Sequence, residues 1–246
     1  MTARIQRFER NPLGRDWIVG DIHGHFTRLQ SALEKIGFAP EQDRLFSVGD
    51  LVDRGPESHQ VLEWLEKPWF HPVQGNHETM AVDWGLKPAV MDKWLYASNG
   101  GAWNIGNLPD ERATYAHALA ALPLAIEIET EQGLVGVVHA EPTHDWDELR
   151  AHLQDPWLDG ADLERLRERM QWERHRLQYR DRHGVRGLRA AVVGHTPLYA
   201  VVQLGNVHFI DTGAWHDEGL GFTFMDAATL EHVTVPHTKP EQAHQP

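Results

Sequence analysis

Side chains that can bind metal ions or transfer protons recur directly after apolar runs. In the first third of the chain these segments read GDIHG at 20–24, GDLVDRG at 49–55 and GNHE at 75–78. Two more, VVHAEP at 137–142 and VVGHTP at 192–197, add a histidine each. Oxygen and nitrogen ligands without sulfur favour Mn²⁺, Fe²⁺, Zn²⁺ or similar ions, and imidazole also transfers protons near neutral pH. These segments are candidates for one site, provided that the fold brings them together.

The apolar runs before the first three segments predict buried strands. Between them, HFTRLQSALEKIGF at 25–38 carries apolar residues at helical spacing and has a glycine near its end. PESHQVLEWLEK at 56–67 opens with proline and carries a similar apolar stripe. The order is therefore strand, helix, strand, helix, strand. In an open parallel sheet, ligands collect beyond the carboxyl ends of the strands, where all three polar segments would emerge.

The middle of the chain is predicted to be helical. Helices are expected over Met80–Tyr96 and Glu111–Leu122, with the SNGGAW segment between them as a loop. Residues 80–122 therefore resemble a cap inserted into the domain.

After the cap region, a hairpin is predicted around Glu131–Gly133. A charged helix follows from Asp162 to about Arg182, and Gly205-Asn206 marks a tight turn between paired strands. Because neither a repeat nor a linker divides the chain, we expect one domain over residues 1–246, with 237–246 as a flexible tail.

Composition excludes several classes of protein. The 23 Lys and Arg residues against 36 Asp and Glu give a formal net charge of −13, which argues against a surface for nucleic acid or anionic lipid. The absence of cysteine excludes disulfides, thiolate nucleophiles and sulfur-ligated zinc. No uncharged apolar stretch reaches about 18 residues. We therefore expect a soluble, cytoplasmic protein that binds neither nucleic acid nor membranes.

Taken together and in order, the five polar segments resemble the metallophosphoesterase superfamily. The motifs GDIHG, GDLVDRG and GNHE are similar to those of its phosphoprotein phosphatase branch, which includes bacterial and phage serine/threonine protein phosphatases. The resemblance is dense over 16–84 and returns at 137–142, 192–197 and 206–225. A single Gly-Asp after a strand would be weak evidence, whereas the ordered set makes coincidence improbable.

The resemblance implies a four-layer α/β/β/α sandwich of the calcineurin-like metallophosphoesterase type with a helical cap insertion. It also implies two divalent metal ions, with manganese the usual choice and iron or zinc as alternatives. Asp50 would bridge them, as a carboxylate can for two ions about 3.5–4 Å apart. The remaining implied ligands are Asp21 and His23 for one ion, and Asn76, His139 and His195 for the other.

The implied reaction is hydrolysis of a phosphomonoester on serine or threonine of a protein or peptide, by a hydroxide that bridges the two ions. His77 would protonate the departing oxygen, and Asp53 would orient that histidine. Arg54 would grip two phosphoryl oxygens with its planar guanidinium. The segment QWERHR offers Arg174 as a second phosphate-binding arginine, with Arg176 as the alternative.

Two other functions compete with this interpretation. Diadenosine tetraphosphate hydrolases share the superfamily, although His23 and Asp53 favour the protein phosphatase branch. A noncatalytic metal-bound binding module would be expected to lack a ligand or the acid, and none is missing. Most tryptophans are expected to pack the core and the cap, with Trp103 and Trp215 as candidates for substrate contact. The natural substrate, tyrosine activity, metal identity and oligomeric state are left open.

Overall fold

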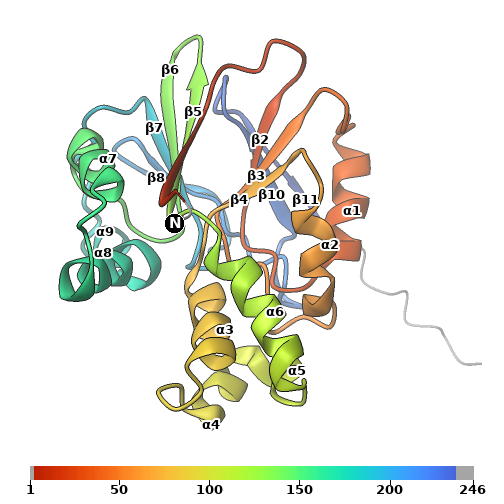
Figure 1. Cartoon of the computed structure of the whole chain (residues 1–246). Helices are drawn as coiled ribbons and strands as arrows, with labels where there is room; N and C mark the ends of the chain where they lie inside the picture. Colours follow the sequence, from red (N-terminus) through yellow and green to blue (C-terminus); the bar gives the residue numbers. More distant parts are fainter. Residues whose placement is uncertain (1–2, 237–246) are drawn as a thin grey trace, which may run out of the picture.

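Two β-sheets lie face to face, and helices cover the outer face of each (Figure 1). The computed structural model describes residues 3–236, so the tail expected at 237–246 lies outside the described residues. The five-stranded sheet has the order β11-β10-β2-β3-β4 and the six-stranded sheet the order β1-β5-β6-β7-β9-β8. This four-layer arrangement confirms the predicted α/β/β/α class.

The strands are short. Those of the five-stranded sheet are β2 (Asp16–Val19), β3 (Arg44–Ser47), β4 (Phe70–Pro72), β10 (Phe222–Asp226) and β11 (His232–Val235). Those of the six-stranded sheet are β1 (Ile5–Phe8), β5 (Ala125–Thr130), β6 (Gly133–Val138), β7 (Ala190–Val193), β8 (Val202–Leu204) and β9 (Val207–Phe209).

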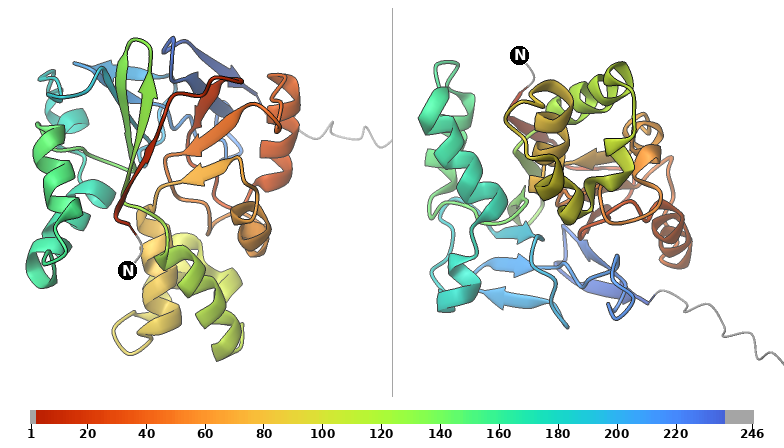
Figure 2. Two further views of the ribbon diagram at one scale, coloured as in Figure 1. Left: turned by 45° about the horizontal axis from the view of Figure 1, so that its top comes forward. Right: turned by 90° about the horizontal axis from the view of Figure 1, so that it is seen from below.

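The helices form three groups (Figures 1 and 2). Helices α1 (Phe26–Lys35) and α2 (Val61–Leu65), the latter preceded by a 3₁₀ turn at Ser58–Gln60, cover the five-stranded sheet. Helices α7 (Trp146–Gln154), α8 (Gly160–Trp172) and α9 (His175–Tyr179) cover the six-stranded sheet. Helices α3 (Asn76–Leu86), α4 (Lys93–Tyr96), α5 (Ala102–Ile105) and α6 (Pro109–Ala120) extend from one end of the sandwich.

Parallel pairing aligns the strand ends from which the polar segments emerge. Strands β2, β3 and β4 run parallel, with Val19 opposite Ser47 and Ser47 opposite Pro72. In the other sheet β6 and β7 are also parallel, with Val137 opposite Val192. The apolar residues that fill the space between the sheets come from both, and all are fully buried: Ile18, Phe46, Val73, Ile126, Val137 and Val192. Burial on both faces explains why the central residues of strands such as β2 and β3 are apolar.

The predicted order of strands and helices is confirmed from β2 to β4, as are both predicted turns, but strand β1 of the other sheet precedes it and was not predicted. Strands β5 and β6 form the hairpin, with Thr130 opposite Gly133. Strands β8 and β9 pair across the turn at Gly205, whose φ of 63° suits glycine.

The expected loop at SNGGAW is wrong, and so is the continuous helix expected over Met80–Tyr96. Helix α3 ends at Leu86, and the chain becomes helical again in α4, a π-helical turn at Ala97–Gly101 and α5. The chain kinks at Gly100, where φ is 101°. The Gly100 carbonyl accepts a hydrogen bond of 3.1 Å from the backbone N–H of Arg54. This long-range contact holds the glycine-rich segment in a conformation that its local sequence does not specify.

The charged helix expected from Asp162 to about Arg182 is also interrupted. Helix α8 ends at Trp172, Glu173 has an extended backbone with ψ of 147°, and α9 begins at His175. Among residues 3–236, no helix is both long and apolar enough to cross a membrane.

The His71 imidazole in β4 provides a pH-dependent element of stability. It packs between the rings of Phe8 and Phe46, with ring centroids 4.5 Å and 5.3 Å away. Burial, followed by the nearby positive charge of Arg44, lowers the pKa of His71 from 6.5 to about 4. The unfolded chain therefore binds more protons between these values, so this stability is complete above pH 6.5 and is lost as the pH falls towards 4.

We expect the free energy of unfolding of His71→Phe to fall less at acid pH than that of the wild-type protein, because phenylalanine keeps the ring packing and cannot be protonated. The wild-type protein should lose roughly 1–3 kcal/mol more than the variant between pH 7 and pH 4.5. Urea unfolding at the two pH values measures this difference. Parallel losses in both proteins would contradict the assignment.

Candidate active site

The residues at the strand ends have an unusual backbone conformation. Five of the seven non-glycine residues with positive φ among residues 3–236 are predicted site residues: His23 (45°), Asp50 (51°), Asp53 (70°), Arg54 (66°) and His195 (68°). Such conformations cost of order 1–3 kcal/mol each and persist only where the surroundings enforce them. The fold therefore holds these side chains in place at some expense of stability.

Asp50 lies at the centre of this group and is buried. Its Oδ2 is 3.5 Å from His23 Nε2, 3.3 Å from His139 Nε2 and 3.9 Å from His77 Nε2. Although burial opposes ionisation, the His139 and His77 imidazoles hold the pKa of Asp50 well below its usual range. Asp50 is thus a carboxylate shared by imidazoles from three different segments.

His139 and His195 meet Asn76 on one side of Asp50. His139 Nε2 is 2.9 Å from Asn76 Oδ1 and 3.1 Å from His195 Nδ1. The other ring nitrogen of His139 donates to the Val48 carbonyl at 2.7 Å, so a neutral His139 points the lone pair of Nε2 at these partners. A cation placed there would satisfy several acceptor atoms at once.

Asp21 lies beside the same cluster. Its Oδ2 is 3.9 Å from His23 Nε2, and its carboxylate accepts the backbone N–H of His195 at 3.0 Å and 3.2 Å. Burial, together with the negative charges of Asp211 and Asp50, raises the pKa of Asp21 well above its usual value. All six predicted ligands are therefore brought together, from both sheets.

The residues present fit a pair of divalent cations. Among residues 3–236, two groups place ligand atoms within 4.8 Å of one another: His23, Asp50 and His77, and Asp50, His139 and His195. Asp50 belongs to both groups, as a bridging ligand would. Burial and the negative charge of Asp50 also raise the pKa of Glu78 to about 7, because this water-poor site disfavours a further negative charge. Nearby divalent ions would offset that charge.

The hydrogen bonds of the remote ring nitrogens separate the histidines into two kinds. His23, His139 and His195 contact the backbone carbonyls of Val52 (3.0 Å), Val48 (2.7 Å) and Trp172 (3.2 Å) through one ring nitrogen each. Such contacts are typical of metal-binding histidines. His77 instead uses Nδ1 to contact Asp53 Oδ2 at 2.8 Å. That carboxylate fixes the orientation of the His77 ring.

Arg54 lies across the opening between the two kinds of histidine. Its Nη1 is 2.7 Å from His23 Nε2 and its Nη2 is 3.0 Å from His77 Nε2. The Trp215 ring lies beneath the guanidinium, with Cζ 4.2 Å from the ring centroid, and also packs edge-on against His23 at 5.1 Å. Trp215, which the sequence marks as a candidate for substrate contact, thus supports the arginine that faces the site.

The two candidate arginines after Trp172 have different surroundings. Arg174 lies at the break between α8 and α9, and its Nε donates to Thr196 Oγ1 at 3.2 Å, beside His195. Arg176 is fully buried, and its Nη1 donates to the carbonyls of Asp181 and His183. The surroundings therefore favour Arg174 as the arginine available to a substrate.

Sequence reasoning assigned no role to Glu78, the last residue of GNHE. Its buried carboxylate accepts the backbone N–H groups of Asp50, Leu51 and Gly75 at 2.7–2.8 Å. It thereby joins the loop after β3 to the start of α3. Its place in the motif was a usable signal, since an acid three residues after a helix N-cap can bind backbone there.

Helices α4 and α5 also contribute residues that the sequence did not mark as hydrogen-bond partners of the site. Trp103 Nε1 and the Tyr96 hydroxyl both donate to Asp53 Oδ1, at 2.7 Å and 3.2 Å. Trp94, expected to pack in the cap, is instead 78% exposed.

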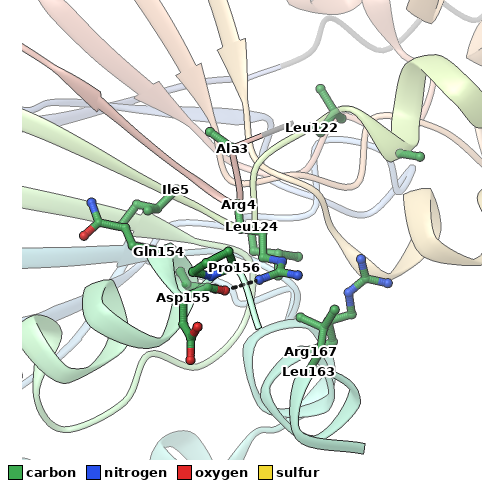
Figure 3. A pocket seen from close by; sticks show the side chains of 12 residues that line it. Ala3, Arg4, Ile5, Leu122, Leu124, Gln154, Asp155, Pro156, Leu163 and Arg167 are labelled. Atoms are coloured by element: carbon green, nitrogen blue, oxygen red, sulfur yellow. Dashed lines mark hydrogen bonds between the residues drawn. The ribbon is translucent and has the colours of Figure 1, made fainter. Parts of the chain in front are cut away.

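A hollow of about 530 Å³ lies away from this site, between β1, the segment after α6 and helices α7 and α8 (Figure 3). Its lining includes Ile5, Leu122, Leu153 and Leu163, and Arg4 crosses it to donate to the Asp155 carbonyl at 2.9 Å. None of the predicted site residues lines it.

Comparison with known proteins agrees with this geometry. Residues 15–216 match the family described as calcineurin-like phosphoesterase. Serine/threonine-protein phosphatase 1 of Salmonella typhimurium is 37% identical over 214 residues, covering 85% of this chain and 91% of that protein. The symmetrical bis(5'-nucleosyl)-tetraphosphatase of a Shewanella species is 45% identical over only 75 residues, covering 29% and 27%. A solved structure described as a candidate diadenosine tetraphosphatase is similar in fold, with a TM-score of 0.63 at 22% identity, covering 97% of this chain and 100% of that one.

Proposed function

We propose, because this chain belongs to the calcineurin-like phosphoesterase family, that it removes phosphoryl groups from serine or threonine residues of phosphoproteins. It is a phosphoesterase hydrolase, and the proposal concerns its substrate and its residues. The observation that carries it is the placement of the His77–Asp53 pair and Arg54 against the buried Asp50 cluster. We further propose that the protein acts in the cytoplasm.

We propose that Asp21 and His23 hold one divalent ion, that Asn76, His139 and His195 hold another, and that Asp50 contacts both. Manganese is the proposed metal, because the resemblance of the motifs implies it; the mixed carboxylate, amide and imidazole ligands also suit iron or zinc. When bound, such a pair of ions supplies Lewis acidity to the phosphoryl group and lowers the pKa of water.

The side chains of the protein would bind the phosphoryl group and transfer the proton. The Arg54 guanidinium presents two N–H groups towards the site, and these would bind two phosphoryl oxygens when the ester enters. Arg174 would bind the phosphoryl group from the break between α8 and α9. With Nδ1 held by Asp53, and with Arg54 turned from His77 onto the phosphoryl oxygens, His77 Nε2 would deliver a proton to the departing oxygen of serine or threonine.

A dinucleoside polyphosphate hydrolase is the second candidate, favoured by the 45% identity of the Shewanella tetraphosphatase over 75 residues. The phosphatase relative supports the first candidate more strongly, because its similarity extends over 85% of this chain. A manganese-supplemented panel of phosphoserine, phosphothreonine and phosphotyrosine peptides beside diadenosine tetraphosphate decides between them. We expect the highest kcat/KM on the phosphoserine or phosphothreonine peptides. A marked preference for diadenosine tetraphosphate would replace the proposal with its alternative.

We expect Arg174→Ala to lower kcat/KM on a phosphopeptide by about 10- to 100-fold, because one cationic donor to the phosphoryl oxygens is lost. Steady-state kinetics with manganese measures the loss. Arg165→Ala is the matched control, since Arg165 lies exposed on α8, where it pairs with nearby Asp162. Wild-type kinetics in Arg174→Ala would remove this arginine from the proposed mechanism.

A further inference from the structure

We propose that Trp103, assisted by Tyr96, is a positioning residue that orients His77 through Asp53. This inference rests on the proposed function, because it concerns proton delivery by His77. It assigns the helical segment from α4 to α5 a part in the reaction, beyond forming a cap.

The Asp53 carboxylate is completely buried, and its two oxygens have separate tasks. Oδ2 contacts His77 Nδ1 at 2.8 Å, while Oδ1 accepts from Trp103 Nε1 at 2.7 Å and from the Tyr96 hydroxyl at 3.2 Å. An indole N–H can only donate. Trp103 therefore fixes which oxygen faces the helical segment and leaves the other directed at His77.

The backbone of Asp53 needs such support. Its φ of 70° and the φ of 66° at Arg54 are both left-handed, in a segment without glycine at either position. The Gly100 carbonyl accepts the N–H of Arg54 at 3.1 Å, and a Cβ on Gly100 would lie 2.4 Å from that nitrogen. The same segment thus holds the backbone of Arg54 and the carboxylate of Asp53.

Tyr96 completes the arrangement from a buried position. Burial and the neighbouring Asp53 charge raise the pKa of the Tyr96 hydroxyl, so it stays protonated and can donate. The Trp103 ring also packs edge-on against Tyr115, with centroids 5.0 Å apart. A merely structural role for Trp103 is therefore the competing explanation, and the test must separate the two.

Dependence on the leaving group makes this separation. Proton donation matters most when the departing oxygen is strongly basic, as in phenyl phosphate, and little when it is weakly basic, as in 2,4-dinitrophenyl phosphate. We expect Trp103→Phe, which removes the N–H and keeps a ring, to lower kcat on phenyl phosphate by about 10-fold or more. On 2,4-dinitrophenyl phosphate the loss should stay below about 3-fold, with KM little changed on both. Tyr96→Phe should also lower the ratio of kcat on phenyl phosphate to kcat on 2,4-dinitrophenyl phosphate, by a smaller factor than Trp103→Phe.

The matched control is Trp146→Phe. Trp146 in α7 is also buried and also donates its Nε1 N–H to a carboxylate, that of Glu127, at 2.6 Å, but it lies over the six-stranded sheet and not in the segment that contacts Asp53. This variant should leave the ratio of the two rates unchanged. If Trp103→Phe lowered kcat equally on both esters, or left it unchanged, the inference would be overturned while the proposed function would stand. Absence of turnover by the manganese-loaded wild-type protein on all phosphoesters would instead overturn the proposed function.

A measurement without turnover tests the contact itself. In ¹⁵N-labelled protein, Asp53→Asn should move the indole N–H resonance of Trp103, identified by its loss in Trp103→Phe, and leave that of Trp146 in place. An unmoved Trp103 resonance would show that the indole does not bind Asp53 and would overturn the inference.

Discussion

Asp50→Asn is expected to abolish turnover, with a fall in kcat/KM of about 10³-fold or more, while the protein stays folded. The carboxylate is the group shared by the two sets of ligand atoms, and its Oδ2 lies within 3.3–3.9 Å of His23, His139 and His77. An amide of the same shape keeps one oxygen but removes the negative charge that would offset two dications.

The expected cause can be measured separately from the rate. Metal content after dialysis should fall from two manganese ions to fewer, whereas the circular dichroism spectrum should match that of the wild-type protein. Asp43→Asn is a fitting control, because Asp43 is equally buried but binds the backbone N–H groups of Arg15 and Ala39. Activity near the wild-type level in Asp50→Asn would exclude the proposed site.

Local pattern was sufficient for the strands that precede four of the six proposed metal ligands, Asp21, His23, Asp50 and Asn76. Apolar runs that end in Gly-Asp or Gly-Asn identified strands β2, β3 and β4, because strands buried on both faces leave a plain signature. Such runs do not show that β6 and β7 belong to the opposite sheet. Their location followed only from the resemblance of the motifs that contain His139 and His195, since strand order depends on contacts between distant segments.

The helical segment was misread for a physical reason. Two adjacent glycines usually mark a loop, yet here the N–H of Arg54 holds Gly100 within a kinked helix. Trp103 and Asp53 are 50 positions apart, and nothing local to a tryptophan reveals the acceptor of its N–H. Likewise, Arg174 and Arg176 could be distinguished only once the helix break between α8 and α9 placed one beside Thr196 and buried the other.

We expect His77→Asn to lower kcat on a phosphoserine peptide by about 10²- to 10⁴-fold. Asparagine cannot be a cationic acid, so the serine oxygen would leave without a proton from this position. Unlike the Asp50 variant, this one should retain both metal ions, because His77 donates to Asp53 and is not among the proposed ligands. Kinetics and metal analysis on the same preparation test both statements, with the exposed His152→Asn as control.

The contrast between the two variants is more informative than either loss alone. If His77 is the acid, His77→Asn should retain much of its rate on 2,4-dinitrophenyl phosphate, whose leaving group needs little protonation, while Asp50→Asn should be inactive on every ester. Each ring nitrogen of His77 lies within 3.0 Å of a partner, Nδ1 at Asp53 and Nε2 at Arg54, so the site holds this imidazole without a metal ion. If His77→Asn lost manganese together with activity on both esters, His77 would have to be regrouped with His23 and Asp50 as a ligand, a grouping that the distances also permit.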